Sequence, residues 1–477
     1  MGCESVIVIG GGLAGLSAAT ALAESGIRVQ LLEKRPYLGG RATSYALPDG
    51  THIDNCQHVT LGCCTNLVDF YERTGASDKI RHYDTLFFAD REGGISTIRS
   101  SPLPAPFHTS LSFLRFSALE WQDKRGIAQA LLRVARSGGR LQGADGMNML
   151  DWLQQNGQTE AAIRRFWRVV LVSALDEELH LTDARYGVDV FWKAFLRNRR
   201  GYRMGVPRVP LGELYEECRR GIERQSGGIE VRATARELRF AEGRFDSVRL
   251  DDGRDLHADA CVAAVPQGAL LELLPEEIRE NDLAFRSLEL LQTSPITGVH
   301  LWFDREVLDL PFVTLLDHTV QWVFNKSALY GATDGPEERC DCDGGQYLQL
   351  VISASYDLIA KSRQEIIDLC VRDLREALPR TRDAQICKAN VVKEVHATFS
   401  PRVGSDALRP PQRTKLRGFF LAGDWTRTGW PSTMEGAVRS GYLAAEAVLE
   451  FAGAPRSFLK ADLPAEGLCR RWARKTG

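Results

Sequence analysis

Three glycines close to the N-terminus have the spacing of a phosphate-binding turn. Gly10, Gly12 and Gly15 form the pattern G-x-G-x-x-G directly after the apolar run Val6–Ile9. In this pattern the glycines allow a tight turn, a close approach of the backbone to a pyrophosphate, and close packing of a helix on a strand. Glu33 ends the next apolar run, where its carboxylate can accept hydrogen bonds from ribose hydroxyls. Together these residues predict a dinucleotide-binding site.

A second glycine pair follows the acid and distinguishes between two classes of dinucleotide. Lys34 and Arg35 lead to Gly39-Gly40-Arg41, which adds backbone N–H groups and a guanidinium that can bind the same pyrophosphate. A nicotinamide site has no need of this second loop. The arrangement E-x5-G-G-R resembles the FAD-binding opening of the amine oxidase and carotenoid desaturase superfamily, so we expect FAD.

The sequence near the C-terminus has another pattern suited to a flavin. The apolar run Phe419–Ala422 is followed by Gly423-Asp424, and Ser432 and Glu435 have capping-box spacing ahead of a predicted helix over 436–451. The positive end of such a helix stabilises negative charge on a reduced flavin. The segment resembles the closing FAD motif of the same superfamily, which places Asp424 on a ribityl hydroxyl. The two ends of the chain should therefore converge on one cofactor.

The resemblance also places a third FAD segment in the middle of the chain, at Ala235 and at Ala264-Val265-Pro266. We expect noncovalent FAD, because the C-terminal motif, where this superfamily usually carries its covalent cysteine, has Trp430 and no cysteine; Cys56 is the alternative anchor. The resemblance implies the following FAD-contacting residues: Gly10, Gly12, Leu13, Ala14, Gly15, Glu33, Lys34, Arg35, Gly40, Arg41, Ala42, Asn55, Gln57, His58, Ala235, Ala264, Gly423, Asp424, Ser432, Thr433, Met434 and Ala437.

A polar cluster at residues 51–58 contains the candidate catalytic residues. In the superfamily this stretch runs beside the isoalloxazine ring, so its side chains could orient the ring or donate a proton. His58 is the first candidate because an unperturbed imidazole titrates near neutral pH, and Asp54 is the second. The alternative is structural, with a turn at Asp54 and Asn55 and a hydrogen-bonded His58. No spacing of cysteines and histidines predicts a metal site.

The predicted elements that position these motifs divide between two domains. Strands and helices around the glycine turns indicate an α/β fold with an FAD-binding Rossmann-like domain of the GR2 type. We expect this domain to be discontinuous, formed by residues 1–100, 209–285 and 405–452. Residues 101–208 and 286–404 should form an inserted α+β substrate domain, and residues 453–477 a tail. Three segments with strand patterns predict an antiparallel sheet in the insertion: 296–303, 320–325 and 347–353.

The composition is that of a globular protein without a strong charge. Lys and Arg number 60 and Asp and Glu 62, a net charge of −2, which gives no general attraction to nucleic acid or anionic lipid. No run approaches 18 consecutive apolar residues, so we do not expect a membrane-spanning helix. Only Met1–Ser5 precede the first predicted strand, which leaves no room for a signal peptide. We therefore expect a cytoplasmic protein.

Two segments have compositions that suggest contact with a membrane surface. Residues 191–208 mix aromatic side chains with cations and contain no acid, and residues 109–136 have an amphipathic pattern. Aromatic rings in such segments can insert among lipids while arginines meet the head groups. The alternative is that both segments pack within their own domain. We expect peripheral contact with the inner face of the plasma membrane, and no binding of nucleic acid.

Four segments resemble one branch of the superfamily closely. Residues 54–76, 166–179, 204–215 and 421–448 are similar to the squalene-associated FAD-dependent oxidoreductases, the hydroxysqualene dehydroxylases. Cys56 and Asp176 depart from that family's pattern, in which we expect glycine and asparagine. These enzymes belong to the bacterial route to squalene and hopanoids.

The resemblance implies reductive removal of the allylic hydroxyl of hydroxysqualene, a long apolar isoprenoid. His58, or a water that it holds, would protonate the leaving hydroxyl, and reduced FAD would deliver hydride to the allylic cation. The pocket must exclude water, which would trap the cation. An unidentified electron donor should reduce the FAD, because the sequence has no second dinucleotide pattern for a nicotinamide.

Three other functions fit the same motifs. The first is a carotenoid- or phytoene-type desaturase, because the motifs do not set the direction of hydride flow. The second is a flavin amine oxidase, with Trp425 and Trp430 as aromatic residues near the flavin. From a different class comes a non-enzymatic flavoprotein or membrane-interaction scaffold.

Overall fold

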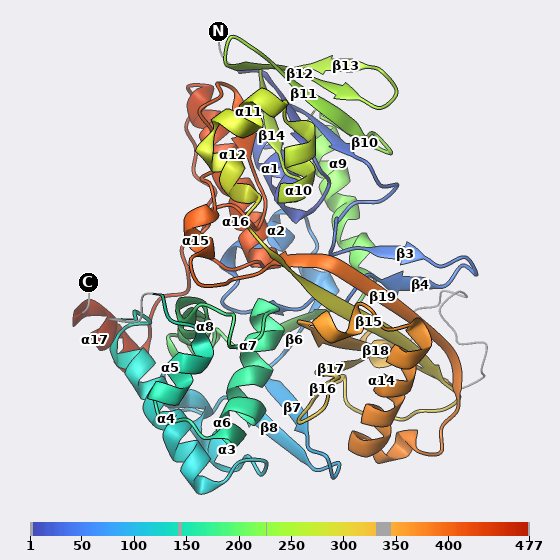
Figure 1. Ribbon diagram of the computed structural model, residues 1–477, viewed down its shortest axis with the longest axis vertical. Coiled ribbons are helices and arrows are strands. Elements are labelled where there is room, and N and C mark those ends of the chain that lie inside the picture. Colours follow the sequence, from blue (N-terminus) through green and yellow to red (C-terminus); the bar gives the residue numbers. More distant parts are fainter. Residues whose placement is uncertain (1–2, 142–145, 226, 331–344, 476–477) are drawn as a thin grey trace.

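The computed structural model describes residues 3–141, 146–225, 227–330 and 345–475 (Figure 1). The upper part of this view contains a five-stranded parallel sheet of order β10-β2-β1-β14-β20. Its strands are β1 (Ser5–Ile9), β2 (Arg28–Glu33), β10 (Gly228–Val231), β14 (Ala260–Ala263) and β20 (Phe419–Leu421). Three distant parts of the chain therefore meet in one sheet, and the predicted α/β fold class is confirmed.

Two helices from opposite ends of the chain cover this sheet together. Helices α1 (Leu13–Ala23) and α16 (Met434–Phe451) pack against each other and against its strands. Gly441 makes the close approach feasible, because a Cβ atom there would lie 2.1 Å from the Ser17 Oγ. The strands are apolar along most of their length because neither face of the sheet is left to water.

The segment around residue 232 divides between two sheets. Strand β10 ends at Val231, Arg232 has a φ of 58°, and β11 (Ala235–Ala241) begins a separate antiparallel sheet with β12 (Arg244–Leu250) and β13 (Asp255–His257). The left-handed conformation at Arg232 ends the first strand. Four helices complete this part: α9 (Glu216–Arg224), α10 (Gln267–Leu273), α11 (Glu276–Asn281) and α12 (Leu283–Leu288).

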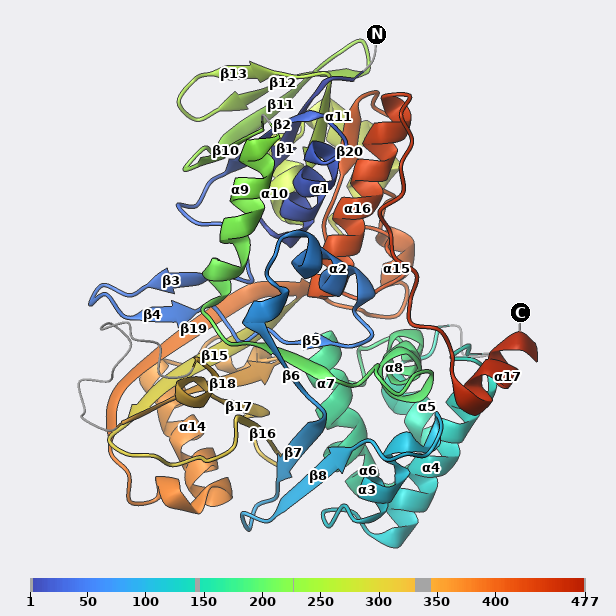
Figure 2. The same ribbon diagram turned by 180° about the vertical axis from the view of Figure 1, so that it is seen from behind.

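A seven-stranded sheet of order β19-β15-β18-β17-β16-β7-β8 lies below the first sheet in Figures 1 and 2. All neighbours are antiparallel except β16 and β7. Helix α14 (Arg363–Ala377) packs on it. The strands are β7 (Thr85–Ala89), β8 (Ile95–Arg99), β15 (Thr293–Phe303), β16 (Phe312–Leu315), β17 (Trp322–Asn325), β18 (Gln346–Ser353) and β19 (Ile386–Phe399).

This sheet includes two strands that we expected in the other domain. Strands β7 and β8 lie within the segment 1–100 of the predicted FAD domain, yet they extend the seven-stranded sheet. The pairing of β7 with β16 requires the chain to leave the first domain before Thr85. A boundary near residue 84 therefore fits the sheet pairing better than residue 100.

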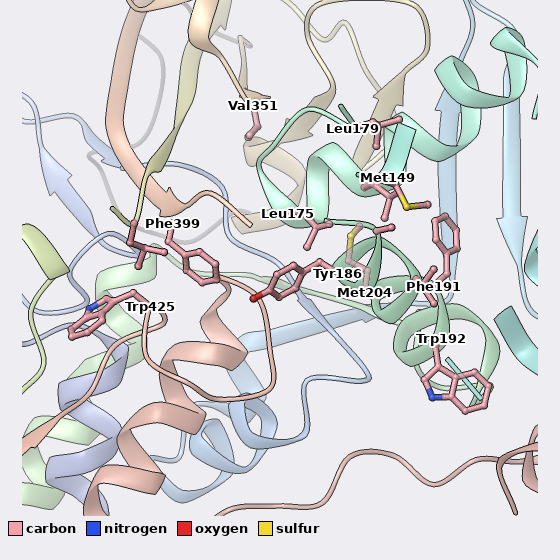
Figure 3. Packing of buried hydrophobic residues seen from close by; sticks show 14 of the residues in the cluster. Met149, Leu175, Leu179, Tyr186, Phe191, Trp192, Met204, Val351, Phe399 and Trp425 are labelled. Atoms are coloured by element: carbon pink, nitrogen blue, oxygen red, sulfur yellow. The ribbon is translucent and has the colours of Figure 1, made fainter. Parts of the chain in front are cut away.

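A helical layer covers the remaining side of the lower region. It consists of α3 (Ser110–Leu114), α4 (Trp121–Arg136), α5 (Met149–Gln155), α6 (Glu160–Ala162), α7 (Arg168–Leu175), α8 (Ala184–Val190) and the π-helical turns η3 (Ile163–Trp167) and η4 (Phe191–Leu196). Its core reaches the long sheet, since Tyr186 packs edge-on against Phe399 of β19 with ring centroids 6.4 Å apart (Figure 3). Leu175 and Met204 lie close to Tyr186 in this core.

Short elements and the C-terminal segment connect these regions. They are the pair β3 (Ser44–Ala46) and β4 (His52–Asp54), the three-stranded sheet of β5 (Thr60–Leu61), β9 (Met204–Pro207) and β6 (Ile80–Tyr83), and the helices α2 (Thr65–Arg73), α13 (Lys326–Tyr330), α15 (Ser405–Leu408) and α17 (Gly467–Lys475). Helix α17 packs against α4, and Asp462 ahead of it pairs with Arg197 and Arg439. Among the described residues, no helix is both long enough and apolar enough to cross a bilayer.

Candidate active site

One cavity of about 790 Å³ extends from the first sheet into the lower region. Every predicted FAD-contacting residue lines it except Gly15. We call the part lined by Gly10–Ala14, Gly39–Ala42 and Gly423–Ala437 the nucleotide end. The sequence segments predicted to converge are thus brought together around one space.

The glycine turn at the nucleotide end leaves no room for side chains. Gly10 has a φ of 107°, and a Cβ atom there would lie 2.5 Å from the carbonyl oxygen of Ala264. Gly15 does not line the cavity, because it faces the turn itself: its Cβ would lie 1.9 Å from the carbonyl oxygen of Gly10. Gly15 therefore brings α1 close to β1, the packing role predicted for the third glycine.

The second glycine loop lies directly beside the first. The Gly39 N–H donates to the Gly11 carbonyl at 2.8 Å, and a Cβ on Gly40 would lie 3.0 Å from the Cα of Gly12. Helix α1 starts at Gly12 without a side-chain cap, so its first N–H groups are available to an anion. This side-chain-free cradle at a helix N-terminus fits a pyrophosphate.

Glu33 holds the two loops together as well as lining the cavity. One carboxylate oxygen accepts the Gly11 N–H at 2.7 Å, and the other accepts the Arg35 N–H at 2.8 Å. Each oxygen keeps a second lone pair, so the carboxylate can still accept hydrogen bonds from ribose hydroxyls.

An ion pair joins the N-terminal and C-terminal motifs. The Arg41 guanidinium binds Asp424 at 2.7 Å, Asp424 also accepts a hydrogen bond from the Ser432 hydroxyl, and Arg41 donates to the carbonyl of Ala397 at the end of β19. Asp424 lines the cavity with Arg41 and Ser432. The chain ends are therefore fixed to each other and to the long sheet at this point.

The predicted capping box at Ser432 and Glu435 is wrong. Thr433 caps α16 instead, since its hydroxyl accepts the Gly436 N–H at 3.0 Å, while Ser432 binds Asp424. Glu435 is buried and caps a different helix: its carboxylate accepts the Leu67 N–H at 2.8 Å at the start of α2. Ser432 and Glu435 have the S-x-x-E spacing, but both side chains bind residues that are distant from their own helix end. A local sequence pattern cannot reveal such partners.

His58 lies half-buried in the cavity wall. Its Nδ1–H donates to the carbonyl of Cys56 at 2.9 Å, and burial lowers the pKa of His58 below its usual value. The imidazole is therefore neutral near pH 7 and presents Nε2 as an acceptor. This geometry does not favour the proton-donating role that we expected of His58.

Asp54 is fully buried but does not line the cavity. Its carboxylate pairs with the Lys326 ammonium at 2.7 Å and accepts hydrogen bonds from the Tyr330 hydroxyl at 2.6 Å and the Leu211 N–H at 3.0 Å. Burial alone would raise the pKa of Asp54, but Lys326 and Tyr330 outweigh it and hold this pKa below its usual range. This ionised, paired carboxylate joins segments of the chain, and the placement does not favour the second proton donor that we expected.

Cys56, the alternative covalent anchor, lies in the cavity wall against the long sheet. A Cβ on Gly298 of β15 would lie 3.0 Å from the Cys56 Sγ, so the glycine makes room for the thiol. Burial raises the pKa of Cys56, and a protonated thiol is a poor nucleophile.

The cavity continues into a region that the sequence patterns did not predict. We call it the apolar arm; side chains from β7, α3, α4, η3, α7 and η4 line it, among them Phe88, Phe113, Leu131, Phe166, Val170 and Phe191. Their signal in the sequence is only helical or strand-like apolar periodicity, which also describes ordinary core. Among the residues that the structure describes, no group of three His, Cys, Asp or Glu residues has metal-binding geometry.

The aromatic residues of 191–208 pack inside the protein, contrary to their expected contact with lipid. Phe191, Trp192 and Tyr202 are buried, and Lys193 pairs with Asp189 at 2.5 Å. The π-helical turn η4 directs this segment into the cavity wall and the helical core. Several exposed apolar side chains lie on 103–121, with Trp121 69% and Leu111 and Leu114 each 49% exposed; others, such as Leu283 and Leu290, lie elsewhere on the protein.

The chain matches the family model described as flavin containing amine oxidoreductase over residues 13–449. It belongs to this family. Its cofactor is FAD, and it is an FAD-dependent oxidoreductase, consistent with the cradle formed by the glycine turns and Glu33.

Similar proteins include carotenoid desaturases. The chain is 29% identical over 466 residues to 15-cis-phytoene desaturase, chloroplastic/chromoplastic, of Solanum lycopersicum, covering 93% of this chain and 77% of that protein. It is 28% identical over 475 residues to the probable zeta-carotene desaturase of Synechococcus elongatus, covering 93% and 98%.

Solved structures share the fold at lower sequence identity. An oxidoreductase from Methanosarcina mazei matches with a TM-score of 0.71 and 18% identity, covering 94% of this chain and all of that one. A triple mutant of putrescine oxidase matches with a TM-score of 0.69 and 14% identity, covering 94% and 99%. At this identity the likeness describes the fold alone.

Proposed function

We propose that this protein is an FAD-dependent desaturase of a long isoprenoid polyene of the carotenoid type. The observation that carries the proposal is the apolar arm, which opens from the same cavity as the nucleotide end. A hydrocarbon substrate offers few polar groups, so its site consists of apolar and aromatic walls. The phytoene and zeta-carotene desaturases among the similar proteins support this class of substrate.

The residues of the chain would divide the work between holding FAD and holding the hydrocarbon. When bound, FAD supplies two-electron hydride chemistry. The glycine cradle and the start of α1 bind the pyrophosphate, Glu33 binds the ribose, and Arg41 with Asp424 fixes the place where the chain ends meet. The aromatic walls of the arm hold the polyene and exclude water. We propose that FAD is bound noncovalently and that a separate, unidentified redox partner completes the cycle.

Reductive dehydroxylation of hydroxysqualene is the second candidate. The observation that favours it is the resemblance of residues 54–76, 166–179, 204–215 and 421–448 to that family. Several residues of these segments line the cavity, including Phe166 and Val170 near the arm. In this reaction hydride would flow from the flavin to the hydrocarbon, opposite to desaturation.

Anaerobic single-turnover assays distinguish the two reactions. Oxidised holoenzyme mixed with phytoene should bleach its flavin and yield a desaturated product if the first proposal holds. Chemically reduced holoenzyme mixed with hydroxysqualene should reoxidise and yield squalene if the second holds. If neither hydrocarbon changes the flavin spectrum or forms product, the assignment to isoprenoid chemistry is wrong.

We also propose peripheral contact with the inner face of the plasma membrane, where such a hydrocarbon would dissolve. Phe107 lines the cavity and is 41% exposed, and Leu111, Leu114 and Trp121 lie exposed on the following residues. Apolar side chains at the opening of an apolar cavity would let a hydrocarbon pass from lipid into the arm without crossing water.

A further inference from the structure

Asp176 is one of several carboxyl groups in the cavity wall that are not part of the FAD cradle; Asp189, Glu272 and Glu394 also line the cavity. Asp176 lines the cavity, is only 3% exposed, and ends helix α7 with a φ of 53°. This left-handed conformation is uncommon for a residue other than glycine, and such positions gather at functional sites. The carbonyl of Asp176 accepts a hydrogen bond from the Ser294 hydroxyl, which helps to hold this turn.

The partners of the Asp176 carboxyl are neutral. Its Oδ1 accepts the Ala354 N–H at 2.7 Å, and its Oδ2 accepts the Thr398 hydroxyl at 2.9 Å. In the described part of the chain, no Lys, Arg or His nitrogen lies within ion-pair distance of it. Asp54, which is buried outside the cavity, has an ammonium at 2.7 Å. Asp176 therefore differs from Asp54 both in facing the cavity and in having no cationic partner there.

Thr398 connects Asp176 to the residues that hold the flavin. It lies between Ala397, whose carbonyl accepts a hydrogen bond from Arg41, and Phe399, whose N–H donates to the Ser432 hydroxyl at 3.3 Å. Three consecutive residues of β19 thus contact both FAD motifs and Asp176. The carboxyl lies where the nucleotide end joins the rest of the cavity.

We infer that Asp176 is the catalytic residue that exchanges a proton with the substrate. The inference rests on the proposed function. In desaturation, one allylic carbon loses hydride to oxidised FAD. The C–H bond of the neighbouring carbon then breaks, its electron pair forms the new double bond, and its proton passes to the Asp176 carboxylate.

The surroundings of Asp176 suit a group that holds and releases a proton. Burial raises the pKa of Asp176 well above its usual value, and the neighbouring Glu177 carboxylate adds to this; the Ala354 and Thr398 hydrogen bonds oppose it. Arg41 and Cys56 also interact electrostatically with Asp176. A catalytic carboxyl is most effective when its pKa lies nearer the working pH.

The test is the single-turnover rate of holoenzyme against pH, for wild type and Asp176→Asn. Asparagine tolerates the left-handed conformation; its Oδ1 can still accept the Ala354 N–H, and its Nδ2 can donate to the Thr398 hydroxyl oxygen. FAD content should therefore not change. General acid–base catalysis contributes about 100-fold or more, and we expect at least that loss of rate. The wild-type rate should rise with pH as the Asp176 carboxyl loses its proton and becomes able to accept one from the substrate. The variant should lose this dependence.

Asp373→Asn is the matched control. Asp373 is also buried and accepts two backbone N–H groups, from Thr319 and Val320, but it lies on α14 outside the cavity. We expect its variant to keep the wild-type rate and pH profile. If Asp176→Asn also keeps both, the inference is overturned.

An infrared difference spectrum of the resting holoenzyme provides a readout without substrate. Wild type minus Asp176→Asn, recorded across a range of pH, should show a carboxyl carbonyl band that disappears as the pH rises through the raised pKa of Asp176. Absence of such a band at every pH would contradict the inference even if the variant loses activity by misfolding. A wild type that shows the band but converts neither hydrocarbon would reject the proposed function and leave the proton-holding site in place.

Discussion

The two ends of the cavity differ in the atoms that form them, because one end is lined mainly by backbone and the other by side chains. The nucleotide end consists mainly of backbone, with glycines whose Cβ atoms would clash and with Glu33 and Asp424 fixed by short polar contacts. The apolar arm consists of side chains contributed by many helices and strands, with Phe113, Phe166 and Phe191 among them. Changes at the first end should therefore affect folding and FAD binding, whereas changes at the second should affect the substrate.

The difference between the two ends follows from what each end has to bind. The nucleotide end needs atoms at fixed positions because pyrophosphate recognition is directional. The arm needs only shape and water exclusion, since dispersion and the hydrophobic effect have little directional preference. A polar joint between segments of the chain lies outside the cavity: Asp54 from the N-terminal segment pairs with Lys326 beside the long sheet.

The largest effect should follow from breaking this joint. Lys326→Met leaves Asp54 buried without its ammonium, and loss of one partner of a buried pair costs about 3–5 kcal/mol. Urea unfolding at neutral pH measures the loss, and Asp54→Asn combined with Lys326→Met should recover part of it. Because Lys326 lowers the pKa of Asp54, the pair stabilises the fold above the ordinary aspartate pKa and less as pH falls through the lowered value. Equal acid sensitivity of wild type and the double variant would contradict this account.

A change in the arm should remove turnover while FAD stays bound. Val170→Trp places an indole in the cavity, and we expect the rate with the hydrocarbon substrate to fall about 100-fold, the scale of a steric exclusion in an apolar pocket. FAD absorbance per protein should match wild type. Val371→Trp on α14, half-buried but outside this cavity, is the control. Loss of FAD from Val170→Trp would show that the two ends are not independent.

A change at the nucleotide end should instead reduce FAD binding and stability. A Cβ at Gly15 would lie 1.9 Å from the Gly10 carbonyl oxygen, so Gly15→Ala must push α1 away from β1. Overpacking of this kind costs about 1–3 kcal/mol, and we expect a lower Tm and reduced FAD content. Gly221→Ala in α9, where nothing lies within 4 Å, should instead raise stability slightly. Normal FAD content in Gly15→Ala would refute the close-packing role.

The smallest effect concerns the exposed apolar side chains of residues 103–121. Replacing Leu111, Leu114 and Trp121 together by Ser should weaken binding to liposomes by about tenfold, because these side chains are partly exposed and their burial in lipid would be favourable. Charge reversal at Arg199 and Arg200, which are exposed, tests the alternative basic patch. If only the charge reversal weakens binding, the apolar residues do not form the contact.

The sequence by itself determined the nucleotide end. G-x-G-x-x-G, Glu33, the second glycine pair and Gly423-Asp424 depend on local backbone geometry, and nearly all of the residues predicted from them line one cavity. Local rules also predicted most strands and helices near these motifs. They failed at Ser432 and Glu435, where tertiary partners compete for the same side chains.

Only the tertiary structure decided the rest of the site. Apolar periodicity in 109–136 and 166–196 describes a buried helix equally well whether its face meets core or cavity, so the arm had no signature of its own. The pairing of β7 with β16 moved a domain boundary, and η4 turned the aromatic residues of 191–202 inward. Asp54 and Asp176 are both aspartates, and the sequence does not distinguish their roles. The tertiary structure places the Lys326 ammonium beside Asp54, which forms a buried ion pair, and the Thr398 hydroxyl beside Asp176, which lines the cavity.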